Sequence, residues 1–550
     1  MTASRAILHR PCGIETEFGV TLEGEYKRKS DQSKSSYAFF DLLDPQWIIP
    51  RELFVPWDPR SRLTEDKDAE EHGYFASQRW LEKSNLLLPN GARLYLDGPH
   101  AELSTPICGN PLQLLRWNRA SYAFVHSICK KHFEKRGLRF TIFRNNFAGR
   151  SRASVFDPDA GRVSFGSHEN YTTLRTVPLN DLVSYLGCSW YIARTPIIGA
   201  GKVGCDVFPY PQMDFQISQR ADFFSAIQSI NTTHERPLFN TRDVTYGDSS
   251  RYRRVHCITG DSNMLQMPEY LKISLTSLVL MMIEDGEFPA RLVFHNPVHA
   301  FHSVSWDIAF AKTYDMEGTA ERRSVLYVLQ AFRDVFDSYL ARYHPERRDL
   351  RRAVKMFSNV LDCLARKDLP ALYGKLDWIT KYSILRRYCE RKGKSPQSFE
   401  AAKFDLLYHD NDHENGFFFR GPHSPAAEEK KLVPEKSFAY AIKRPPPTRS
   451  RLIVEAIRRY SERVYISNYW DKISVRDQNG DIKLITFPDP TFCWRSDLRA
   501  LFRRPFDEFL RRGQELGILH IEAECTPMKP ITLGSPDRAS DIFFRREFID

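Results

Sequence analysis

The sequence lacks the features of a secreted, membrane-spanning or disulfide-stabilised protein. Its ten cysteines are scattered over 550 residues without a Cys-x-x-Cys pair, which is typical of reduced, buried thiols. The first residues, MTASRAILHRPCG, have no apolar core of a signal peptide, and the longest apolar run, residues 275–283, is about half a membrane span. We therefore expect a cytoplasmic protein that does not associate with a membrane.

A strong excess of one charge is also missing. The chain has 79 Lys and Arg against 69 Asp and Glu, a net charge of +10, and 13% of its residues are aromatic. This composition excludes a largely disordered chain, and the modest basic excess is typical of a solvated surface. The densest basic stretch, residues 443–463, is the best candidate for a docking face, and we expect no nucleic-acid partner.

A phosphate-binding loop of the Walker type is absent as well. Residues 199–204 read GAGKVG, but Val203 follows Lys202 where the motif needs Ser or Thr. Pro196 stands six positions before that lysine, where the motif needs Gly. If this protein binds ATP, it holds the phosphates in another way.

The patterns that are present predict a mixed fold of two domains, because 550 residues exceed the usual size of one hydrophobic core. Alternating apolar and polar residues predict strands at 14–22, 92–96, 139–143 and 163–165. Helical spacing predicts helices at 112–133, 264–283, 323–343, 350–366, 378–391 and 449–460. We expect an α+β protein whose second half is mainly helical.

Composition shifts suggest the domain boundaries. We expect a catalytic domain at 1–430 that contains a charged, mobile surface insertion at 24–84. A linker at 431–447 ends in three consecutive prolines, which neither a helix nor a central strand can continue. A small C-terminal α/β domain with a divergent tail follows at 448–550, and Asn479-Gly480 predicts a hairpin between strands 472–476 and 482–487.

Acidic residues on the predicted strands are the first candidates for chemistry. Glu15 and Glu17 share a strand face because side chains repeat every two residues, and so do Tyr95 and Asp97, with Glu102 shortly beyond. Carboxylates that share one face repel each other unless a cation lies between or beside them. This arrangement predicts a divalent cation.

Further polar residues extend this set. His168 and Glu169 follow in FGSHENY, and a basic segment supplies Arg242, Arg253, Arg254 and His256. Any one of these residues is more often part of a surface salt bridge than of a site. Together they provide hard oxygen ligands for Mg²⁺ and guanidinium groups for phosphate oxygens, which phosphoryl chemistry requires.

Seven motifs occur in the order found in the Pup ligase and Pup deamidase/depupylase family, relatives of glutamine synthetase. They are GIETEFGV, NGARLYLD, SHENY, SQRAD, NTRD, YRRVH and GDSN, and the resemblance continues through LDWITKYSILRRY, LLYHD and PPPTR to WDKI. The resemblance implies a glutamine synthetase-like domain with a curved antiparallel sheet, backed by helices, that holds Mg²⁺ and ATP. It also implies that Asp97 is the essential aspartate and that Glu15, Tyr95, Glu102 and His256 are metal ligands.

Our candidate site combines the resemblance with the residue pattern. Asp97 is the catalytic residue, and the residues that bind the cofactor are Arg93, Arg242, Arg253 and Arg254. The metal ligands are Glu15, Glu17, Tyr95, Glu102, Glu169 and His256. A separate polar run, residues 409–414, lacks the spacing of a calcium-binding loop and is predicted as an exposed turn.

The two branches of the family imply opposite reactions. The insertion after the first strand and the segments NPLQLLRW, GSHENY and AFHSVSWD resemble the depupylase branch, which favours cleavage of a glutamyl amide or isopeptide bond. GIETEFGV and GDSNM resemble the ligase branch, which forms that bond through a glutamyl phosphate. We expect a small acidic Pup-like partner that ends in Gln or Glu, and also modified proteins. A catalytically silent peptide-binding scaffold is the third hypothesis.

Two departures from the family pattern leave the modifier's identity open. The chain has His100-Ala101-Glu102-Leu103 where the family usually has His-Pro-Glu-Tyr. It also has TRDVTYGD at 241–248 where the family usually has TRDEPHAD. The metal-binding carboxylate remains, so the changed neighbours bear on the partner, for which a divergent Pup-like protein and an unrelated glutamyl peptide are the alternatives.

Overall fold

The fold is organised around one large sheet. The computed structural model describes residues 6–23, 32–50, 53, 56, 83–97, 100–145, 164–204, 214–232, 235–467, 470–477 and 480–522. Within these residues the sheet has nine strands in the order β2-β3-β4-β1-β6-β11-β10-β9, and the ninth, β5, pairs with the far half of β1. The strands are β1 (Cys12–Glu23), β2 (Asn85–Leu87), β3 (Arg93–Asp97), β4 (His100–Ser104), β5 (Arg139–Phe143), β6 (Ser167–Leu174), β9 (Phe224–Ser229), β10 (Arg236–Asn240) and β11 (Tyr252–Cys257).

Nearly all neighbouring strands of this sheet are antiparallel, as predicted. The exception is the β9–β10 pair, which is parallel. Helices follow mainly after the sheet strands, so the expectation of an α+β fold with a helical second half is confirmed. The principal helices are α5 (Pro111–Ile128), α9 (Gln266–Glu284), α10 (Pro297–Trp306), α11 (Val325–Tyr343), α12 (Arg348–Ala365), α13 (Asp377–Lys392) and α14 (Phe399–Tyr408).

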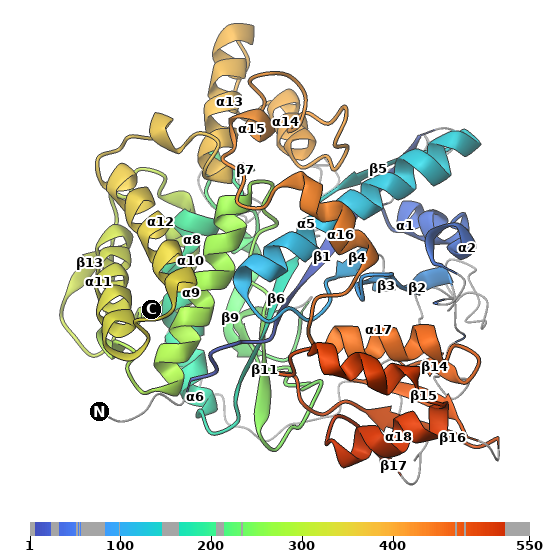
Figure 1. Ribbon diagram of the computed structural model, residues 1–550. Coiled ribbons are helices and arrows are strands. Elements are labelled where there is room, and N and C mark those ends of the chain that lie inside the picture. The colour runs from blue at the N-terminus through green and yellow to red at the C-terminus, as the bar shows by residue number, and fades with distance from the viewer. Residues whose placement is uncertain are drawn as a thin grey trace, which may run out of the picture.

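The alternation along β1 decides which side chains the helices cover. Ile14, Thr16 and Phe18 are buried, and the Thr16 hydroxyl lies 2.8 Å from the Tyr122 hydroxyl of α5. Glu15 and Glu17 alternate with them and therefore point to the opposite face. Figure 1 shows α9 to α12 gathered on one side of the molecule and the C-terminal unit on the other.

The C-terminal unit has its own sheet but shares a core with the large one. Strands β14 (Val464–Ile466), β15 (Lys472–Arg476), β16 (Ile482–Thr486) and β17 (His520–Glu522) pair in sequence order, with α17 (Arg449–Arg459) and α18 (Phe506–Glu515) packed beside them. The predicted hairpin strands are confirmed. Leu452 and Ile457 of α17 belong to the same apolar cluster as Phe18 and Leu94 of the large sheet. The unit is therefore tied to the first half of the catalytic sheet.

Two segments differ from their predicted character. The predicted linker contains helix α16 (Phe438–Lys443), and it packs on α5, where the Trp117 indole donates to the Arg444 carbonyl at 2.9 Å. Part of the predicted mobile insertion is helix α1 (Gln32–Asp41), whose Tyr37 and Phe39 are buried in the core. These aromatic side chains make that part structural, whereas residues 24–31 and 57–82 lie outside the described residues.

The remaining predicted elements fall close to their places. Helices predicted at 264–283, 350–366, 378–391 and 449–460 match α9, α12, α13 and α17, and the one predicted at 112–133 begins as α5. The helix predicted at 323–343 begins at Val325, after the short strand β13 (Arg322–Ser324). The strand predicted at 163–165 is wrong for its described part, because residues 164–166 are not in a strand and β6 begins only at Ser167.

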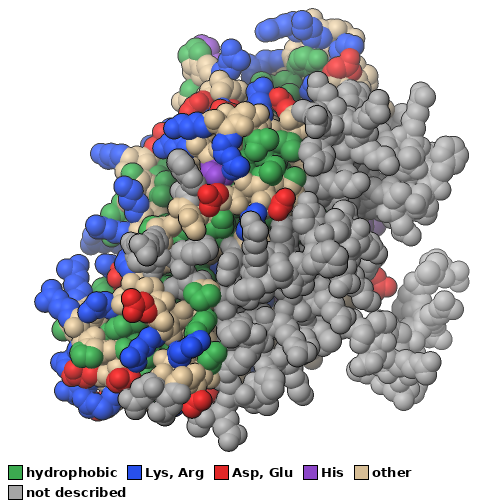
Figure 2. Space-filling model, turned by 90° about the vertical axis from the view of Figure 1, so that its right-hand side faces the viewer, with side chains coloured by type: hydrophobic (Ala, Val, Ile, Leu, Met, Phe, Trp, Pro, Cys, Tyr) green, Lys and Arg blue, Asp and Glu red, His purple; other side chains and the backbone are tan. Residues whose placement is uncertain are grey.

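The predicted basic stretch does not form one exposed patch. Arg449 is buried, Arg458 pairs with Glu455 at 3.1 Å, and Arg459 donates to the Phe502 carbonyl at 3.1 Å. In the view of Figure 2, Lys and Arg side chains are interspersed with acidic ones. The expectation of an ordinary solvated surface is thus consistent with the described residues.

A buried acidic cluster joins three helices beneath the sheet. Arg119 of α5 pairs with Glu269 of α9 at 2.7 Å, and Asp377 of α13 and the carboxylate of Glu429 lie within its electrostatic reach. Burial raises the pKa of Asp377 to about 6 and that of Glu429 to about 7. One guanidinium therefore faces three carboxylates, and two of them resist ionisation.

This cluster predicts a pH dependence of stability. Because both folded pKa values are raised, the folded protein holds more protons than the unfolded chain, and the stabilisation present below about pH 4 is lost as pH rises through 6 to 7. In Glu429→Gln, whose side-chain carbonyl can still accept from the Gln266 amide, we expect a decline between pH 5 and 8 that is shallower by on the order of 1–3 kcal/mol. Urea unfolding at each pH measures it.

The exposed neighbour variant Glu428→Gln is the matched control and should follow the wild-type curve. An unchanged slope in Glu429→Gln would show that Glu429 is already ionised in the folded protein at pH 5.

Candidate functional site

The register of the sheet gathers the predicted acidic residues into rows on the face opposite α5. Strand pairing aligns Tyr95 of β3 with Glu102 of β4, and Glu102 with Glu17 of β1. The next row holds Arg93, Ser104, Glu15 and His168, from β3, β4, β1 and β6. Residues directly opposite on antiparallel strands have their Cβ atoms about 4.5–5.5 Å apart, so these side chains crowd together.

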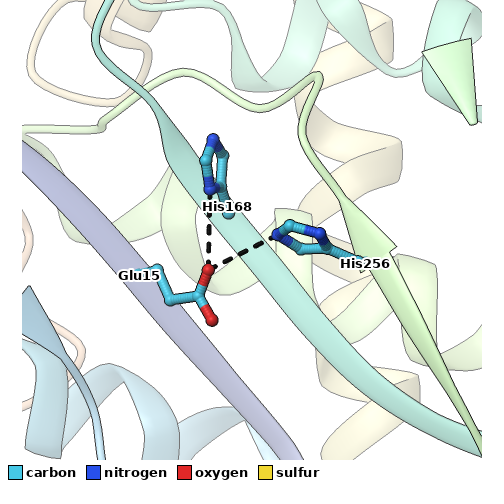
Figure 3. Close-up of side chains that lie close together, drawn as sticks. All are labelled: Glu15, His168 and His256. Carbon is cyan, nitrogen blue, oxygen red and sulfur yellow. Dashed lines mark ion pairs between the residues drawn. The ribbon is translucent and has the colours of Figure 1, made fainter. Parts of the chain in front are cut away.

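The best-defined cluster is Glu15, His168 and His256. The Glu15 Oε2 atom lies 3.5 Å from His168 Nδ1 and 3.4 Å from His256 Nε2, and Figure 3 shows both rings directed at that oxygen. One ligand atom from each residue lies within 4.8 Å of the other two. Within the described ranges, no other group of three or more His, Cys, Asp or Glu side chains meets this spacing.

The electrostatics of the cluster suit a cation. Burial acts to raise the pKa of Glu15, but Arg254 and the two histidines outweigh it and hold the pKa well below its ordinary value. Burial, followed by the charge of Arg254, lowers the pKa of His256 to about 3. His256 is therefore a neutral imidazole with a lone pair, and neither ring nitrogen has a hydrogen-bond partner among the residues that the structure describes. A divalent cation fits this donor set.

Beside this cluster lies a concentration of negative charge. Glu102 is 2% exposed, and no described cation lies within ion-pair distance of it. Burial, then the charges of Asp97 and Glu15, raise the pKa of Glu102 well above its ordinary value. Burial and the nearby Glu102 likewise raise the pKa of Tyr95. A bound cation would relieve this repulsion, which agrees with the predicted roles of Glu17, Glu102 and Tyr95.

Asp97 lies at the end of β3, at the open edge of the same face. It is exposed, and its register partner on β4 is His100. Desolvation by the surrounding protein raises the pKa of the Asp97 carboxyl, and the negative charge of Glu17 raises it further. The His100 Nδ1 atom is 3.7 Å from Glu17, so the accessible carboxylate adjoins the acidic rows.

Arg254 is the predicted cofactor-binding arginine that contacts the cluster directly. Its Nη2 atom donates to Glu15 Oε1 at 3.1 Å, and its Nε atom donates to Asn170 Oδ1 at 2.6 Å. Arg242 has no hydrogen-bond or ion-pair partner for its guanidinium among the residues the structure describes, and it lies within electrostatic reach of Tyr246. The phosphate-binding role of Arg254 and Arg242 stays a prediction.

Arg93 and Arg253 have structural contacts as well. The Arg93 guanidinium donates to the Ser467 carbonyl at 3.0 Å and stacks over the Trp470 ring at 4.6 Å. Arg253 is held by Asp243 at 3.1 Å and by the Val177 carbonyl at 2.9 Å. Arg253 also lines the pocket next to Glu15, so its predicted phosphate-binding role stays a prediction.

A pocket lies between the large sheet and the C-terminal unit, next to Glu15. Tyr246, Trp470 and Arg449 line it together with Arg254 and the start of β1. Arg449 bridges the two parts, because it donates to the Phe487 carbonyl at 2.9 Å and to the Tyr246 carbonyl at 2.6 Å. Flat aromatic walls beside guanidinium groups suit a nucleotide base next to its phosphates.

The predicted metal ligand Glu169 does not belong to this site. It lies on the opposite face of β6, where Arg194 binds both of its oxygens at 2.7 and 2.8 Å and the Tyr171 hydroxyl donates at 2.6 Å. Its side chain is 1% exposed, so this is a buried structural ion pair. The structure thus separates Glu169 from the cluster, whereas the neighbouring His168 lies in it with Glu15 and His256.

Sequence reasoning also left other residues near the site unassigned. His100, Asn170, Arg220 and Arg236 were not among the candidates. Arg220 and Arg236 are buried, the charge of Glu17 acts on both, and neither has a carboxylate within ion-pair distance in the described ranges. The polar alternation of His168, Asn170 and Thr172 along SHENYT was the signal that could have identified the correct face of β6.

The two rejected sequence motifs also have local structures. Residues 409–414 are exposed only in part, because His409 and Asn411 are buried, so the predicted exposed turn is wrong for these two residues. Asp412 accepts from the amides of Glu414 and Asn415 at 2.9 and 3.0 Å. Lys202 of the GAGKVG segment begins strand β7 (Lys202–Val203) and pairs with Asp222 at 3.4 Å. A phosphate-binding loop would instead lead into a helix. Among the described residues, no helix is long and apolar enough to cross a membrane.

The fold and the site define an α+β protein whose open, mainly antiparallel sheet carries carboxylates and histidines beside an aromatic pocket. The chain belongs to the Pup-ligase protein family, whose sequence profile matches residues 10–474. It is therefore an enzyme of the group that contains Pup ligases and depupylases.

Individual relatives come from both branches. The chain is 30% identical over 502 residues to the Pup–protein ligase of Corynebacterium jeikeium (strain K411), covering 88% of this chain and 96% of that one. It is 30% identical over 483 residues to the depupylase of Acidothermus cellulolyticus, covering 85% and 91%. A crystal structure of the Pup ligase PafA in complex with Pup matches with a TM-score of 0.70 and 25% identity, covering 90% and 92%.

Paired substitutions test the assignment of ligands. We expect Glu15→Gln to weaken Mn²⁺ binding at least about tenfold, because ligand charge sets the affinity of a divalent site. Glu169→Gln should leave Mn²⁺ binding unchanged but cost about 3–5 kcal/mol of stability, because Arg194 loses its buried partner. Electron paramagnetic resonance of Mn²⁺ and denaturant unfolding measure the two effects. Loss of Mn²⁺ binding by Glu169→Gln at unchanged stability would return Glu169 to the metal site.

Proposed function

We propose that this chain is an ATP- and Mg²⁺-dependent enzyme that cleaves a glutamyl side-chain amide or isopeptide bond of a small, acidic Pup-like protein. The observation that carries the proposal is Asp97, an accessible carboxylate at the open edge of a row of otherwise enclosed acids. Family membership supports the substrate class, since the relatives are named as Pup ligases and depupylases. Segments that resemble the depupylase branch favour cleavage.

The residues would divide the work by position. Glu15, His168 and His256 would hold one cation, with Glu17, Glu102 and Tyr95 available beside it. Arg254 and Arg242 would bind phosphate oxygens, and Tyr246, Trp470 and Arg93 would enclose the base. Bound Mg²⁺ and ATP would supply positive charge and a phosphoryl group at the point where these rows meet.

Asp97 would act on the glutamyl carbonyl. Its carboxylate would either attack the carbonyl carbon or take a proton from an attacking water, while the departing amine receives a proton. The buried Arg220 and Arg236, close to Glu17, would balance negative charge that develops there. His100 adjoins both Glu17 and Asp97 and would help to orient them.

Formation of the same bond is the second candidate. The ligase relative from Corynebacterium jeikeium aligns over 96% of its length, and the solved complex of similar fold is a Pup ligase with Pup. In that reaction Asp97 would take a proton from the substrate lysine before the amine attacks a glutamyl phosphate. Both reactions require the same ionised carboxylate in the same place.

A paired assay with Asp97→Asn tests the proposal. We expect wild-type protein with ATP and Mg²⁺ to release a lysine-containing protein from a Pup conjugate, and Asp97→Asn to be slower by about 10²–10⁴-fold, because the proton acceptor or nucleophile is lost. Release measured on denaturing gels, and ADP formed with a free glutamyl donor and an amine, separate cleavage from ligation.

Asp362→Asn on the exposed side of α12 is the matched control and should keep full activity. Ligation without release would show that the chain forms the isopeptide bond, as the ligase branch does, and does not cleave it. Nucleotide binding without turnover in either assay would support the scaffold hypothesis instead.

A further inference from the structure

Asn170 lies between the candidate metal site and the candidate phosphate-binding arginine, and no role has been assigned to it above. Its Nδ2 atom donates to Glu15 Oε1 at 3.0 Å, and its Oδ1 atom accepts from Arg254 Nε at 2.6 Å. Arg254 Nη2 closes the ring by donating to the same Glu15 oxygen at 3.1 Å. Three side chains from three adjacent strands thus form one hydrogen-bonded triangle.

The two oxygens of Glu15 have separate environments. Oε1 accepts from Asn170 and Arg254, whereas Oε2 faces His168 and His256 at 3.5 and 3.4 Å. Two donors on one side fix the plane of the carboxylate and leave the other oxygen directed at the histidines, as Figure 3 shows for the three residues it labels. The triangle therefore orients Glu15 without occupying the oxygen that faces the cluster.

Strand register explains why Asn170 can reach both partners. It lies on β6 opposite Gly13 of β1 on one side and opposite His256 of β11 on the other. Glu15 is two residues from Gly13 on β1 and therefore lies on the same face of the sheet as Asn170. Arg254 is two residues from His256 on β11 and therefore shares its face.

The triangle also needs the chemistry of an amide. The amide of Asn offers an NH₂ donor and a separate oxygen acceptor on one uncharged group, whereas a Ser or Thr hydroxyl uses a single atom for both, and Gln is longer than Asn by one methylene. The amide must place its NH₂ toward the carboxylate and its oxygen toward the guanidinium, because the reverse orientation opposes like partial charges. Asp would keep the acceptor, lose the donor and add negative charge.

We propose that Asn170 is a positioning residue that holds Glu15 and Arg254 in fixed relation, so that the divalent cation and the polyphosphate bind as one unit. This inference rests on the proposed function, because it assumes that Glu15 binds the cation and Arg254 the phosphates. In this proposal Asn170 does not bind the cation or the phosphates itself. It acts on them through its hydrogen bonds to Glu15 and Arg254.

Binding measurements without substrate test the inference. In Asn170→Ala we expect Mn²⁺ affinity, measured by electron paramagnetic resonance, to fall about 10–100-fold, as is typical when a partner that orients a metal ligand is removed. ATP affinity, measured by calorimetry, should fall as well. In Asn170→Asp the Mn²⁺ affinity and the ATP affinity should change in different directions. The added carboxylate retains or strengthens Mn²⁺ binding, but it partly neutralises Arg254 and so weakens ATP binding.

Two controls distinguish positioning from loss of structure. Asn180→Ala makes the same chemical change at an exposed position and should match wild type. Glu169→Gln destabilises the protein from the other face of β6 and should keep Mn²⁺ binding. If Asn170→Ala kept the wild-type affinities for Mn²⁺ and ATP, the inference would be wrong. It would also be wrong if both Asn170 variants lost affinity in proportion to their loss of stability. Either result would leave the proposed function standing. Failure of the wild-type protein to bind Mn²⁺ would overturn both it and the proposed metal site.

Discussion

The structure depends on keeping several carboxylates together on one face of a sheet. Glu15, Glu17 and Glu102 lie in adjacent positions on β1 and β4, and Asp97 lies at the edge beside them. Such a grouping is unfavourable in a partly buried environment unless positive charge offsets it. Arg254 offsets part of it at Glu15, and Glu102 has no described cation near enough to pair. The protein therefore gathers negative charge on one face of the sheet, which a bound divalent cation would offset.

The packing on the other face of the sheet stabilises the fold against the repulsion between these carboxylates. The opposite face of β1 is closed by Ile14 and Thr16, and the opposite face of β6 is closed by the Glu169–Arg194 pair. The same strands thus present satisfied polar groups to the helices and unsatisfied ones to the open side. This asymmetry concentrates the chemistry on one surface, where the C-terminal unit adds Trp470 and Arg449 beside the pocket.

Local pattern was enough to predict much of this arrangement. Alternation in GIETEFGV predicted both the strand and the shared face of Glu15 and Glu17, because strand periodicity is a property of the backbone. Helical spacing predicted α9, α12 and α13 close to their observed bounds. The site was predicted less completely, since His168 and Glu169 are adjacent and the choice between them depends on which face of β6 meets the helices. Arg194, which binds Glu169, is 25 residues away along the chain.

The sequence by itself determined the family, the α+β character, the strand that carries Glu15 and Glu17, and the candidate role of Asp97, because these follow from ordered motifs and from the two-residue period of a strand. Only the tertiary structure decided that His168 and His256 meet at one oxygen of Glu15, that Arg194 holds Glu169 on the opposite face of β6, and that Asn170 joins Glu15 to Arg254. The physical reason is strand register: which residues of distant segments become neighbours is set by pairing across the sheet, and no local pattern encodes it.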